Sequence, residues 1–235
     1  RKESSAASDV YKRQNTNNIH IKNQVLANKF SSKIIKINKK TNSLDIKKLN
    51  NPYFVTEGNK ENLLFVIEIA KLFKIKKKNL FEVLKKFDGL KYRQQIIHKS
   101  KNLTIINDSK ATSLSSSISI LRSMNNVSWI VGGLAKKGDK FLLSKNDCKS
   151  FKAYIFGENK DLFIKEFKKV VKYETFKNLK TLIKKVFLDI KVDNNKKHQT
   201  ILFSPAAASF DSFKNFEERG KYFNRLIKGI NNVKW

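Results

Sequence analysis

Short apolar runs alternate with amphipathic segments from about residue 90 to the end of the chain. The runs have the length and β-branched or aromatic composition of buried strands, and the segments between them place apolar residues at helical spacing. This alternation predicts an α/β fold, a Rossmann-like, mostly parallel sheet with helices on both faces. The predicted strands are Leu103–Ile106, Ser128–Val131, Ala153–Phe156, Val171–Glu174 and Thr200–Phe203. The predicted helices cover about 113–124, 160–170, a segment ending at 190, and 213–230.

The first part of the chain has a different pattern. Apolar residues at helical spacing predict helices over Asn59–Phe73 and Lys78–Phe87, and Gly89 then terminates the second helix, so we place a domain boundary at Asp88. Before Pro52 the pattern is mixed, with a short helix predicted at 23–30 and a strand at 32–37. Residues 1–14 have no periodicity and are interpreted as an unassigned tail or read-through sequence outside the fold.

Composition narrows the class of protein. With 235 residues and 40% apolar content, the chain can bury the core of one large or two modest domains. No apolar run approaches the length of a membrane span, and the N-terminus lacks the apolar centre of a secretory signal, so we expect a cytoplasmic protein without membrane contact. One cysteine and three isolated histidines indicate neither a disulfide nor a metal site.

The net charge of +30 raises a non-enzymatic alternative, a basic nucleic-acid-binding module. Two features argue against this alternative. Only six of the 50 basic residues are arginine, although the forked guanidinium is the group that base and phosphate recognition favours. The lysines are also spread along every segment, as expected of a solvated surface, and this distribution is compatible with a small anionic substrate.

Polar residues follow the first predicted strand. Asp108, Lys110 and Thr112 come directly after it, and in parallel sheets the ligand crevice lies beyond the carboxyl ends of the strands. We therefore predict that these three side chains project there together. The alternative is that Asp108 only caps the next helix and that Lys110 is a solvated lysine.

Two more strand ends would meet at the same crevice. The second strand leads into Gly132-Gly133, which would let the backbone approach a ligand, and then into Lys136. The last strand leads into the small-residue run 204–210, which contains Ser209. An ordinary turn at the glycines, and a small-residue helix start against the sheet, remain the alternatives to a binding site.

Three of these segments together resemble a known family. They read Asn-Asp-Ser-Lys-Ala-Thr (107–112), Gly-Gly-Leu-Ala-Lys-Lys-Gly-Asp-Lys-Phe (132–141) and Ser-Pro-Ala-Ala-Ala-Ser-Phe-Asp-Ser-Phe-Lys-Asn-Phe-Glu-Glu-Arg-Gly (204–220). In order and spacing they are similar to the Mur ligases, in particular those that add D-glutamate. The resemblance implies that residues 15–88 are the C-terminal part of the central ATP-binding domain, and that 89–235 are the D-glutamate-binding domain.

The resemblance also implies a reaction. ATP would phosphorylate the alanine carboxylate of UDP-N-acetylmuramoyl-L-alanine, and the amine of D-glutamate would attack the acyl phosphate to form an amide in peptidoglycan synthesis. A carboxylate is a poor electrophile until one oxygen becomes a phosphate leaving group, so the protein must orient the reactants and stabilise charge. ATP and Mg²⁺ are the implied cofactors, with the Mg²⁺ ligands expected in a part of the family that this sequence lacks. A monomer is expected.

Candidate site residues follow from the motif matches, position by position. The resemblance implies that Asn59 and Asn62 contact ATP on the adenine side. It also implies that Arg93 contacts the phosphates and that Asp108 contacts the ribose. It implies that D-glutamate and the neighbouring phosphate are held by Lys110, Thr112, Lys136, Ser209 and Phe216. Lys110 and Arg93 would be the catalytic residues.

The sequence departs from the family in several places. Gly58 stands where the family usually has histidine, and Tyr92-Arg93-Gln94-Gln95 replaces a frequent His-Arg-x-Glu. A Gly-x-x-x-x-Gly-Lys-Ser/Thr phosphate loop is absent from the 235 residues, which predicts that this chain does not turn over alone. An alternative enzyme class, a dinucleotide-dependent oxidoreductase, lacks its Gly-x-Gly-x-x-Gly fingerprint here.

Overall fold

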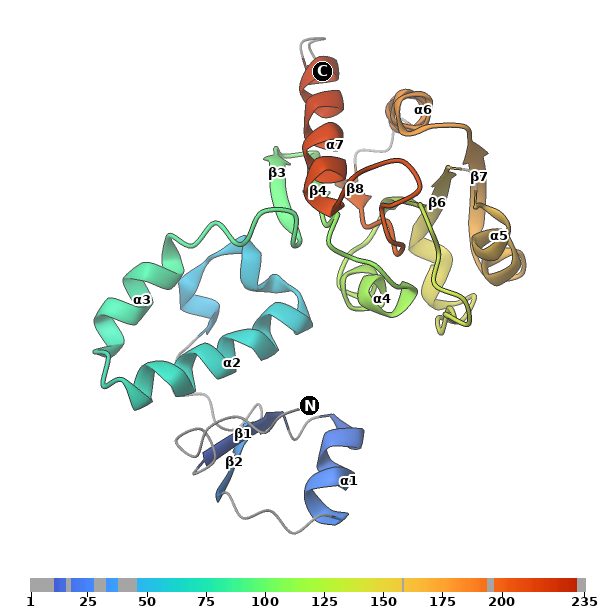
Figure 1. Ribbon diagram of the computed structural model, residues 1–235. Helices are drawn as coiled ribbons and strands as arrows, with labels where there is room; N and C mark the ends of the chain where they lie inside the picture. Colours follow the sequence, from blue (N-terminus) through green and yellow to red (C-terminus); the bar gives the residue numbers. More distant parts are fainter. Residues whose placement is uncertain are drawn as a thin grey trace. The chain divides into compact units, whose positions relative to one another are not determined.

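The computed structural model describes residues 11–15, 18–27, 33–37, 46–157, 159–193 and 197–231 (Figure 1). The chain forms two compact units, residues 1–87 (unit 1) and 88–235 (unit 2). Among the described residues, no helix combines the length and the apolar character that crossing a membrane requires.

Unit 1 combines a small sheet with a helical part. Strand β1 (Tyr11–Asn15) pairs in parallel with β2 (Lys33–Ile37), and helix α1 (Ile19–Ala27) connects them. The interpretation of 1–14 as a tail is therefore wrong for residues 11–14, whose backbone pairs in spite of their polar composition. The predicted helix at 23–30 begins earlier, at Ile19, and its residues 28–30 lie outside the described ranges.

The helical part of unit 1 agrees with the sequence pattern. It contains η3 (Ile46–Leu49), η4 (Pro52–Val55), α2 (Glu57–Leu72) and α3 (Lys77–Lys85). Thr56 caps α2, because its side-chain oxygen accepts the amide hydrogen of Asn59. The buried apolar cluster of this part is Leu49, Phe54, Leu63, Ile67 and Leu84.

Unit 2 contains a six-stranded sheet in the order β3-β4-β8-β5-β6-β7. All neighbouring pairs are parallel except β3 with β4, so the predicted parallel α/β sheet is confirmed. The strands are β3 (Gln95–Lys99), β4 (Leu103–Asn107), β5 (Val127–Gly132), β6 (Phe151–Phe156), β7 (Lys172–Phe176) and β8 (Gln199–Phe203). Each of the five strands predicted in this region is found within two residues of its expected ends.

Helices cover both faces of this sheet (Figure 1). Helices α4 (Leu114–Arg122) and α5 (Asp161–Phe167), with η5 (Asp147–Ser150), pack on one face around Trp129. Helices α6 (Leu179–Val192) and α7 (Phe216–Asn231) pack on the other face, where the rings of Phe203 and Phe223 stack with their centroids 4.3 Å apart. Two apolar layers therefore fix the strand ends that carry the candidate site.

Strand β3 is absent from the sequence prediction. It lies at an edge of the sheet, and its pairing with β4 shifts register between Ile96 and His98, as in a β-bulge. Only its last residue, Lys99, is exposed, and the others are half-buried, so β3 lacks the clean alternation that identifies a strand.

Candidate functional site

The predicted motifs meet at the carboxyl ends of three adjacent strands, because β8 lies between β4 and β5. The loop after β5 pairs with the loop after β8. Leu134 and Ala208 exchange two backbone hydrogen bonds of 3.0 Å, and the Gly132 amide donates to the Pro205 carbonyl at 3.0 Å. These bonds join two of the three motifs into one edge.

Gly132 and Gly133 are required by the backbone at this edge. Their φ angles are +148° and +121°, which side chains with a Cβ rarely adopt. A Cβ on Gly132 would lie 2.2 Å from the Phe156 carbonyl oxygen, and one on Gly133 would lie 2.6 Å from the Ala208 carbonyl oxygen. The glycine pair therefore permits the ends of β5, β6 and β8 to pack closely together. An isolated turn would not require glycine for such contacts between strands.

Asp108 is oriented differently from the prediction. Its side chain is 6% exposed, and its oxygens accept hydrogen bonds from the Gln94 amide (3.1 Å) and the Ser204 hydroxyl (3.0 Å). The expectation that it projects into an open crevice with Lys110 and Thr112 is therefore wrong. The helix-capping alternative is wrong too, since Ser113 caps α4. Burial raises the pKa of Asp108 to about 7, although both hydrogen bonds and the charge of Arg93 lower it.

Ser204 connects Asp108 to the core of unit 2. The Ser117 and Ser204 hydroxyls lie 2.7 Å apart, and the Trp129 indole donates to the Ser204 carbonyl at 2.8 Å. All three side chains are buried. Sequence reasoning missed the roles of Ser117 and Trp129, because helical or strand periodicity says nothing of polar contacts between elements.

Lys110 and Phe216 lie together, although more than a hundred residues separate them. The Lys110 ammonium is 3.8 Å from the centroid of the Phe216 ring, in a cation–π contact. Ser109, next to Lys110, donates its hydroxyl to the Phe216 carbonyl at 2.8 Å. The first and third motifs are thus joined by side-chain contacts.

Arg219 is fully buried beneath this site and was not among the predicted residues. Its guanidinium donates to the carbonyls of Ser109 (2.8 Å), Ala207 (2.9 Å) and Ala208 (3.2 Å), and its Nε donates to the Ser109 hydroxyl (3.1 Å). Burial lowers the pKa of Arg219 to about 10, against the charge of Asp211, which raises it. In the sequence, Arg219 precedes Gly220 within a polar segment at the start of a predicted helix. This context gave no signal that its side chain would donate hydrogen bonds to buried carbonyls.

The other D-glutamate candidates differ in exposure. Thr112 and Lys136 are exposed, whereas Ser209 is 3% exposed, and its carbonyl accepts the amides of Ser212 and Phe213. Lys136 lines a hollow of about 310 Å³ together with Leu114, Gly138 and Glu166. At one side of this hollow Asp139 accepts the Leu114 amide at 2.6 Å. The Lys136 loop therefore reaches the start of α4, close in sequence to Thr112.

The ATP candidates lie in both units. Arg93 is an exposed side chain at the start of unit 2. In unit 1, Asn59 and Asn62 were predicted to share a face of α2, but Asn59 is buried and donates to the Tyr53 carbonyl at 2.7 Å, while Asn62 is exposed. The 60° offset between positions i and i+3 of a helix is enough to separate them at the boundary of a small core.

Mg²⁺ does not fit the residues that the structure describes. Mg²⁺ prefers carboxylate oxygens, and within the described ranges no group of three or more His, Cys, Asp or Glu side chains could hold a metal ion. Asp108, the carboxylate nearest the phosphate candidates in sequence, has both oxygens occupied by protein donors.

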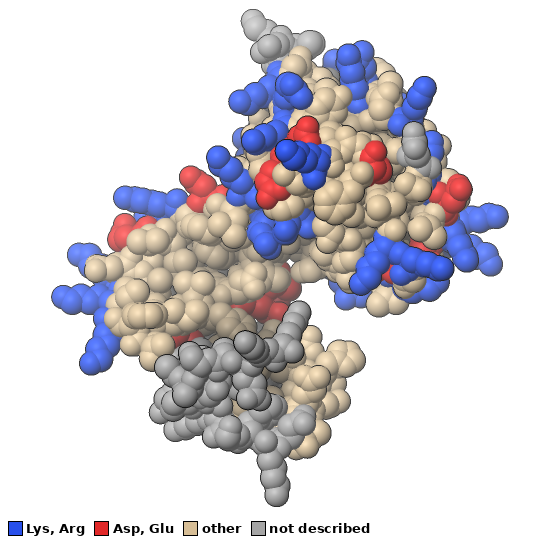
Figure 2. Space-filling model, viewed as in Figure 1, with Lys and Arg blue, Asp and Glu red and all other residues tan. Residues whose placement is uncertain are grey.

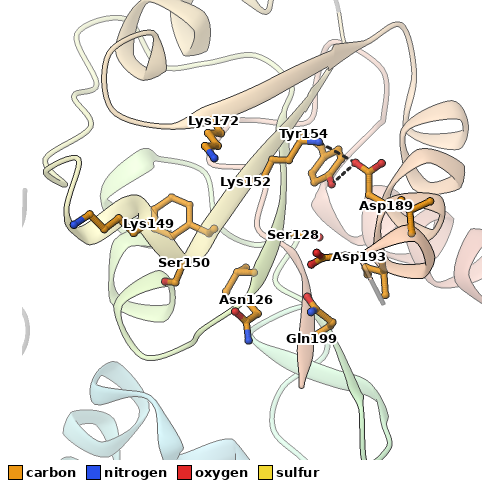
Figure 3. A pocket seen from close by; sticks show the side chains of 14 residues that line it. Asn126, Ser128, Lys149, Ser150, Lys152, Tyr154, Lys172, Asp189, Asp193 and Gln199 are labelled. Carbon is orange, nitrogen blue, oxygen red and sulfur yellow. Dashed lines mark hydrogen bonds and ion pairs between the residues drawn. The ribbon is translucent and has the colours of Figure 1, made fainter. Parts of the chain in front are cut away.

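A larger hollow lies at the opposite, amino-terminal edge of the sheet (Figure 3). It measures about 420 Å³ and contains none of the predicted site residues. On its wall Asp189 accepts hydrogen bonds from Lys152 (2.9 Å) and Tyr154 (2.8 Å), as the dashed lines show. Burial opposes ionisation of Asp189, but hydrogen bonds from Lys185, Lys152 and Tyr154 lower its pKa to about 2. This network fastens α6 to β6.

Basic side chains do not gather on the visible face of unit 2. Figure 2 shows Lys and Arg scattered over it and interspersed with acidic and uncharged residues. A nucleic-acid interface would require a continuous basic stripe on one face. The visible face therefore has the mixed charge expected of an ordinary solvated surface.

The fold is similar to that of a solved Mur ligase. A crystal structure of MurF from Acinetobacter baumannii matches with a TM-score of 0.50 and 13% identity, over 74% of this chain and 38% of that one, which is a likeness of fold. No protein-family model matches the chain.

Two sequence relatives carry the same ligase name. UDP-N-acetylmuramoylalanine--D-glutamate ligase of Wolbachia sp. subsp. Brugia malayi is 36% identical over 173 residues, which are 74% of this chain and 34% of the relative. The ligase of the same name from Francisella philomiragia is 33% identical over 191 residues, 80% of this chain and 44% of the relative. The chain thus spans between a third and a half of each relative's length, and the relatives give no support to the nucleic-acid alternative.

Proposed function

We propose that unit 2 is the D-glutamate-binding domain of an ATP-dependent Mur ligase, and that residues 15–88 belong to its ATP-binding domain, with the boundary at Asp88. The complete enzyme would join D-glutamate to UDP-N-acetylmuramoyl-L-alanine in the cytoplasm. The observation that carries this proposal is the contact between Lys110 and Phe216, which joins the first and third motifs at the strand ends. The identity to D-glutamate ligases supports the choice of amino acid.

The chemistry assigns these residues to binding and charge stabilisation. D-glutamate carries two carboxylates, and fixing both would leave its amine free to attack the acyl phosphate. Lys136 and the buried Ser209 offer a point charge and a hydroxyl for this purpose, and Thr112 offers a second hydroxyl. Lys110 and Arg93 would balance charge on the phosphate as it is transferred and released.

The bond changes balance without a further reactant. The alanine carboxylate oxygen takes the terminal phosphoryl group of ATP, and ADP leaves. The D-glutamate nitrogen then forms the amide bond to the carbonyl carbon, inorganic phosphate departs with that oxygen, and the nitrogen releases its proton to solvent. ATP and Mg²⁺ enter this scheme through the ATP-binding domain.

The test is site-specific binding of D-glutamate to this chain. In a ¹⁵N-labelled sample, D-glutamate should perturb amides of the segments 108–112, 133–137 and 207–216, and L-glutamate should perturb them more weakly. Lys136→Gln should weaken binding by about tenfold, because a charge-assisted hydrogen bond contributes about 1.5–3 kcal/mol. Lys184→Gln, at an exposed lysine of α6, is the matched control. Shifts spread over surface lysines, or equal binding of both enantiomers, would contradict the proposal.

A further inference from the structure

The turn that carries Arg93 has an uncommon backbone. Tyr92 and Gln94, on either side of Arg93, have φ angles of +62° and +48°. Left-handed conformations cost free energy for residues other than glycine, and they persist where neighbouring groups fix them. Within the turn, the Tyr92 amide donates to the Gln95 side chain at 3.2 Å and the Arg93 amide donates to the Leu90 carbonyl at 3.1 Å, and further contacts come from outside it.

The outside contacts come from the segment after β4 and from α7. The Gln94 amide donates to Asp108 Oδ1 at 3.1 Å, and the Lys110 amide donates to the Tyr92 carbonyl at 3.0 Å. The Tyr92 ring packs against Gly220, where a Cβ would lie 2.3 Å from its Cδ1. Tyr92 is 8% exposed, whereas the Arg93 side chain is exposed. The backbone around Arg93 is fixed while its side chain faces solvent.

Asp108 is itself held from the opposite side. Ser204, at the end of β8, donates to Oδ2 at 3.0 Å, and the Ser117 hydroxyl of α4 lies 2.7 Å from that of Ser204. Both carboxylate oxygens of Asp108 therefore have donors within the protein. The position suits a carboxylate that supports a backbone turn better than one that binds ribose.

We propose that Asp108 is a positioning residue, which fixes the turn presenting Arg93 through the Gln94 amide and does not bind the ribose itself. This inference rests on the proposed function only for the role of Arg93 as a phosphate contact.

Protonation gives the proposal a measurable signature. The groups that face Asp108 are the Gln94 amide, the Ser204 hydroxyl with Ser117 behind it, and the charge of Arg93. The ionised carboxylate accepts hydrogen bonds from both donors. When it is protonated, one of its oxygens carries a hydrogen and becomes a donor, so one acceptor position is lost. The turn should loosen as the pH falls through the titration of Asp108.

The first experiment follows the Gln94 amide by ¹⁵N NMR from about pH 5.5 to about pH 8.5. In the wild-type chain its shift should titrate together with the Asp108 carboxyl carbon. Ser204→Ala should move both midpoints to higher pH, because the lost hydrogen bond favours the charged form. This arm needs no substitution at Asp108. Different midpoints for the two nuclei would overturn the proposal.

The second experiment compares two substitutions. Asp108→Asn keeps an acceptor for Gln94, so it should preserve slow exchange of the Gln94 amide and abolish its titration. Asp108→Ala should speed that exchange by about tenfold or more, since a hydrogen bond to a buried group is lost. Asp139→Asn, at another carboxylate that accepts a backbone amide, is the control and should change neither property. Equal exchange in the wild type and Asp108→Ala would overturn the proposal.

The third measurement concerns Arg93. Titration with tripolyphosphate at about 0.15 M salt, followed at the Arg93 Nε resonance, should be about tenfold weaker in Asp108→Ala and nearly unchanged in Asp108→Asn. If adenosine instead shifts the Asp108 carboxyl carbon in the wild type, Asp108 binds the ribose and the proposal fails. No Arg93 response to tripolyphosphate would contradict the proposed phosphate role, while the Gln94 exchange still decides the role of Asp108.

Discussion

The Lys110 ammonium lies 3.8 Å from the centre of the Phe216 ring, and this contact connects the loop after β4 to the start of α7. A lysine side chain has four rotatable bonds, so a free ammonium at the site would occupy many positions. The ring limits these positions and keeps the charge near the strand ends. Phe216 therefore places a charge, in addition to any contact it makes with substrate.

The coupling between Lys110 and Phe216 can be measured. Lys110→Met, Phe216→Leu and the double variant form a double-mutant cycle, read as free energy of unfolding in urea. We expect a coupling of about 0.5–1 kcal/mol, the range of a partly exposed cation–π contact. Raising the salt concentration should change it little at such short range. A coupling near zero would show that the two groups are neighbours without an energetic contact.

Substitution of Arg219 should be far more costly than that of Arg225 on the same helix. Arg219→Leu removes the guanidinium donor from the carbonyls of Ser109 and Ala207 in a buried site, whereas Ala208 keeps the Leu134 amide, and we expect a loss of about 3–5 kcal/mol. Arg219→Lys should rescue little, since one ammonium cannot span the same acceptors.

Arg225, exposed near the ring of Tyr222, is the control. Arg225→Leu should cost less than about 1 kcal/mol. Similar urea midpoints for the Arg219 and Arg225 variants would contradict the role given to Arg219.

Gly220 and Gly229 give a matched pair within α7. Gly220→Ala would place a methyl group 2.3 Å from the Tyr92 ring, so the ring and the turn before Arg93 must move. Among the described residues, no atom outside the chain neighbours and the helix backbone lies within 4 Å of a Cβ at Gly229, and alanine there should stabilise the helix by about 1 kcal/mol. Thermal unfolding should shift in opposite directions for the two variants. A stabilising Gly220→Ala would mean that Tyr92 does not pack there.

Stability should fall as the pH rises from about 4 to about 7 through the contribution of Asp108. Its pKa is raised from 3.8 to about 7, so the folded state binds the proton more tightly than the unfolded state within this window. The slope from one such group is at most about 1.4 kcal/mol per pH unit, and it vanishes above the folded-state pKa. Urea unfolding of the wild type minus that of Asp108→Asn isolates this slope. A difference that does not vary between pH 5 and pH 7 would show that Asp108 titrates normally.

The isolated chain should not hydrolyse ATP. It contains no Gly-x-x-x-x-Gly-Lys-Ser/Thr loop, and its described residues hold no carboxylate cluster for Mg²⁺. A phosphate-release assay with ATP, Mg²⁺, D-glutamate and UDP-N-acetylmuramoyl-L-alanine should give the background rate. The Wolbachia ligase is the positive control for the reagents. Steady release that depends on both substrates would contradict the expectation.

The sequence predicted the sheet well and the polar contacts poorly. Strands such as β5 contain an apolar run, Trp129–Val131, whose residues are buried, and this signal depends on the local sequence alone. The orientation of Asp108 depends on Gln94 and Ser204, 14 and 96 residues away, and no local pattern contains such information. Arg219 was missed for the same reason, since its acceptors are carbonyls and carry no side-chain identity.

The candidate residues that came from the family resemblance include one pair that the structure brings together, Lys110 with Phe216. The pair was reached through motif order, since neither residue has a pattern of its own. The roles of the other candidates remain predictions, because they depend on a ligand; these candidates are Thr112, Lys136 and Ser209. Strand β3 was missed because an edge strand with a bulge lacks regular alternation.

The bulge in β3 has a consequence for the solution behaviour of this protein. An edge strand with a regular register offers a row of unpaired amides and carbonyls to a second sheet, and chains can then associate edge to edge. The shifted register between Ile96 and His98, followed by the exposed Lys99, interrupts that row. The first strand of unit 2 thereby protects a very apolar sheet from intermolecular strand pairing, and straightening it should promote aggregation before it affects ligand binding.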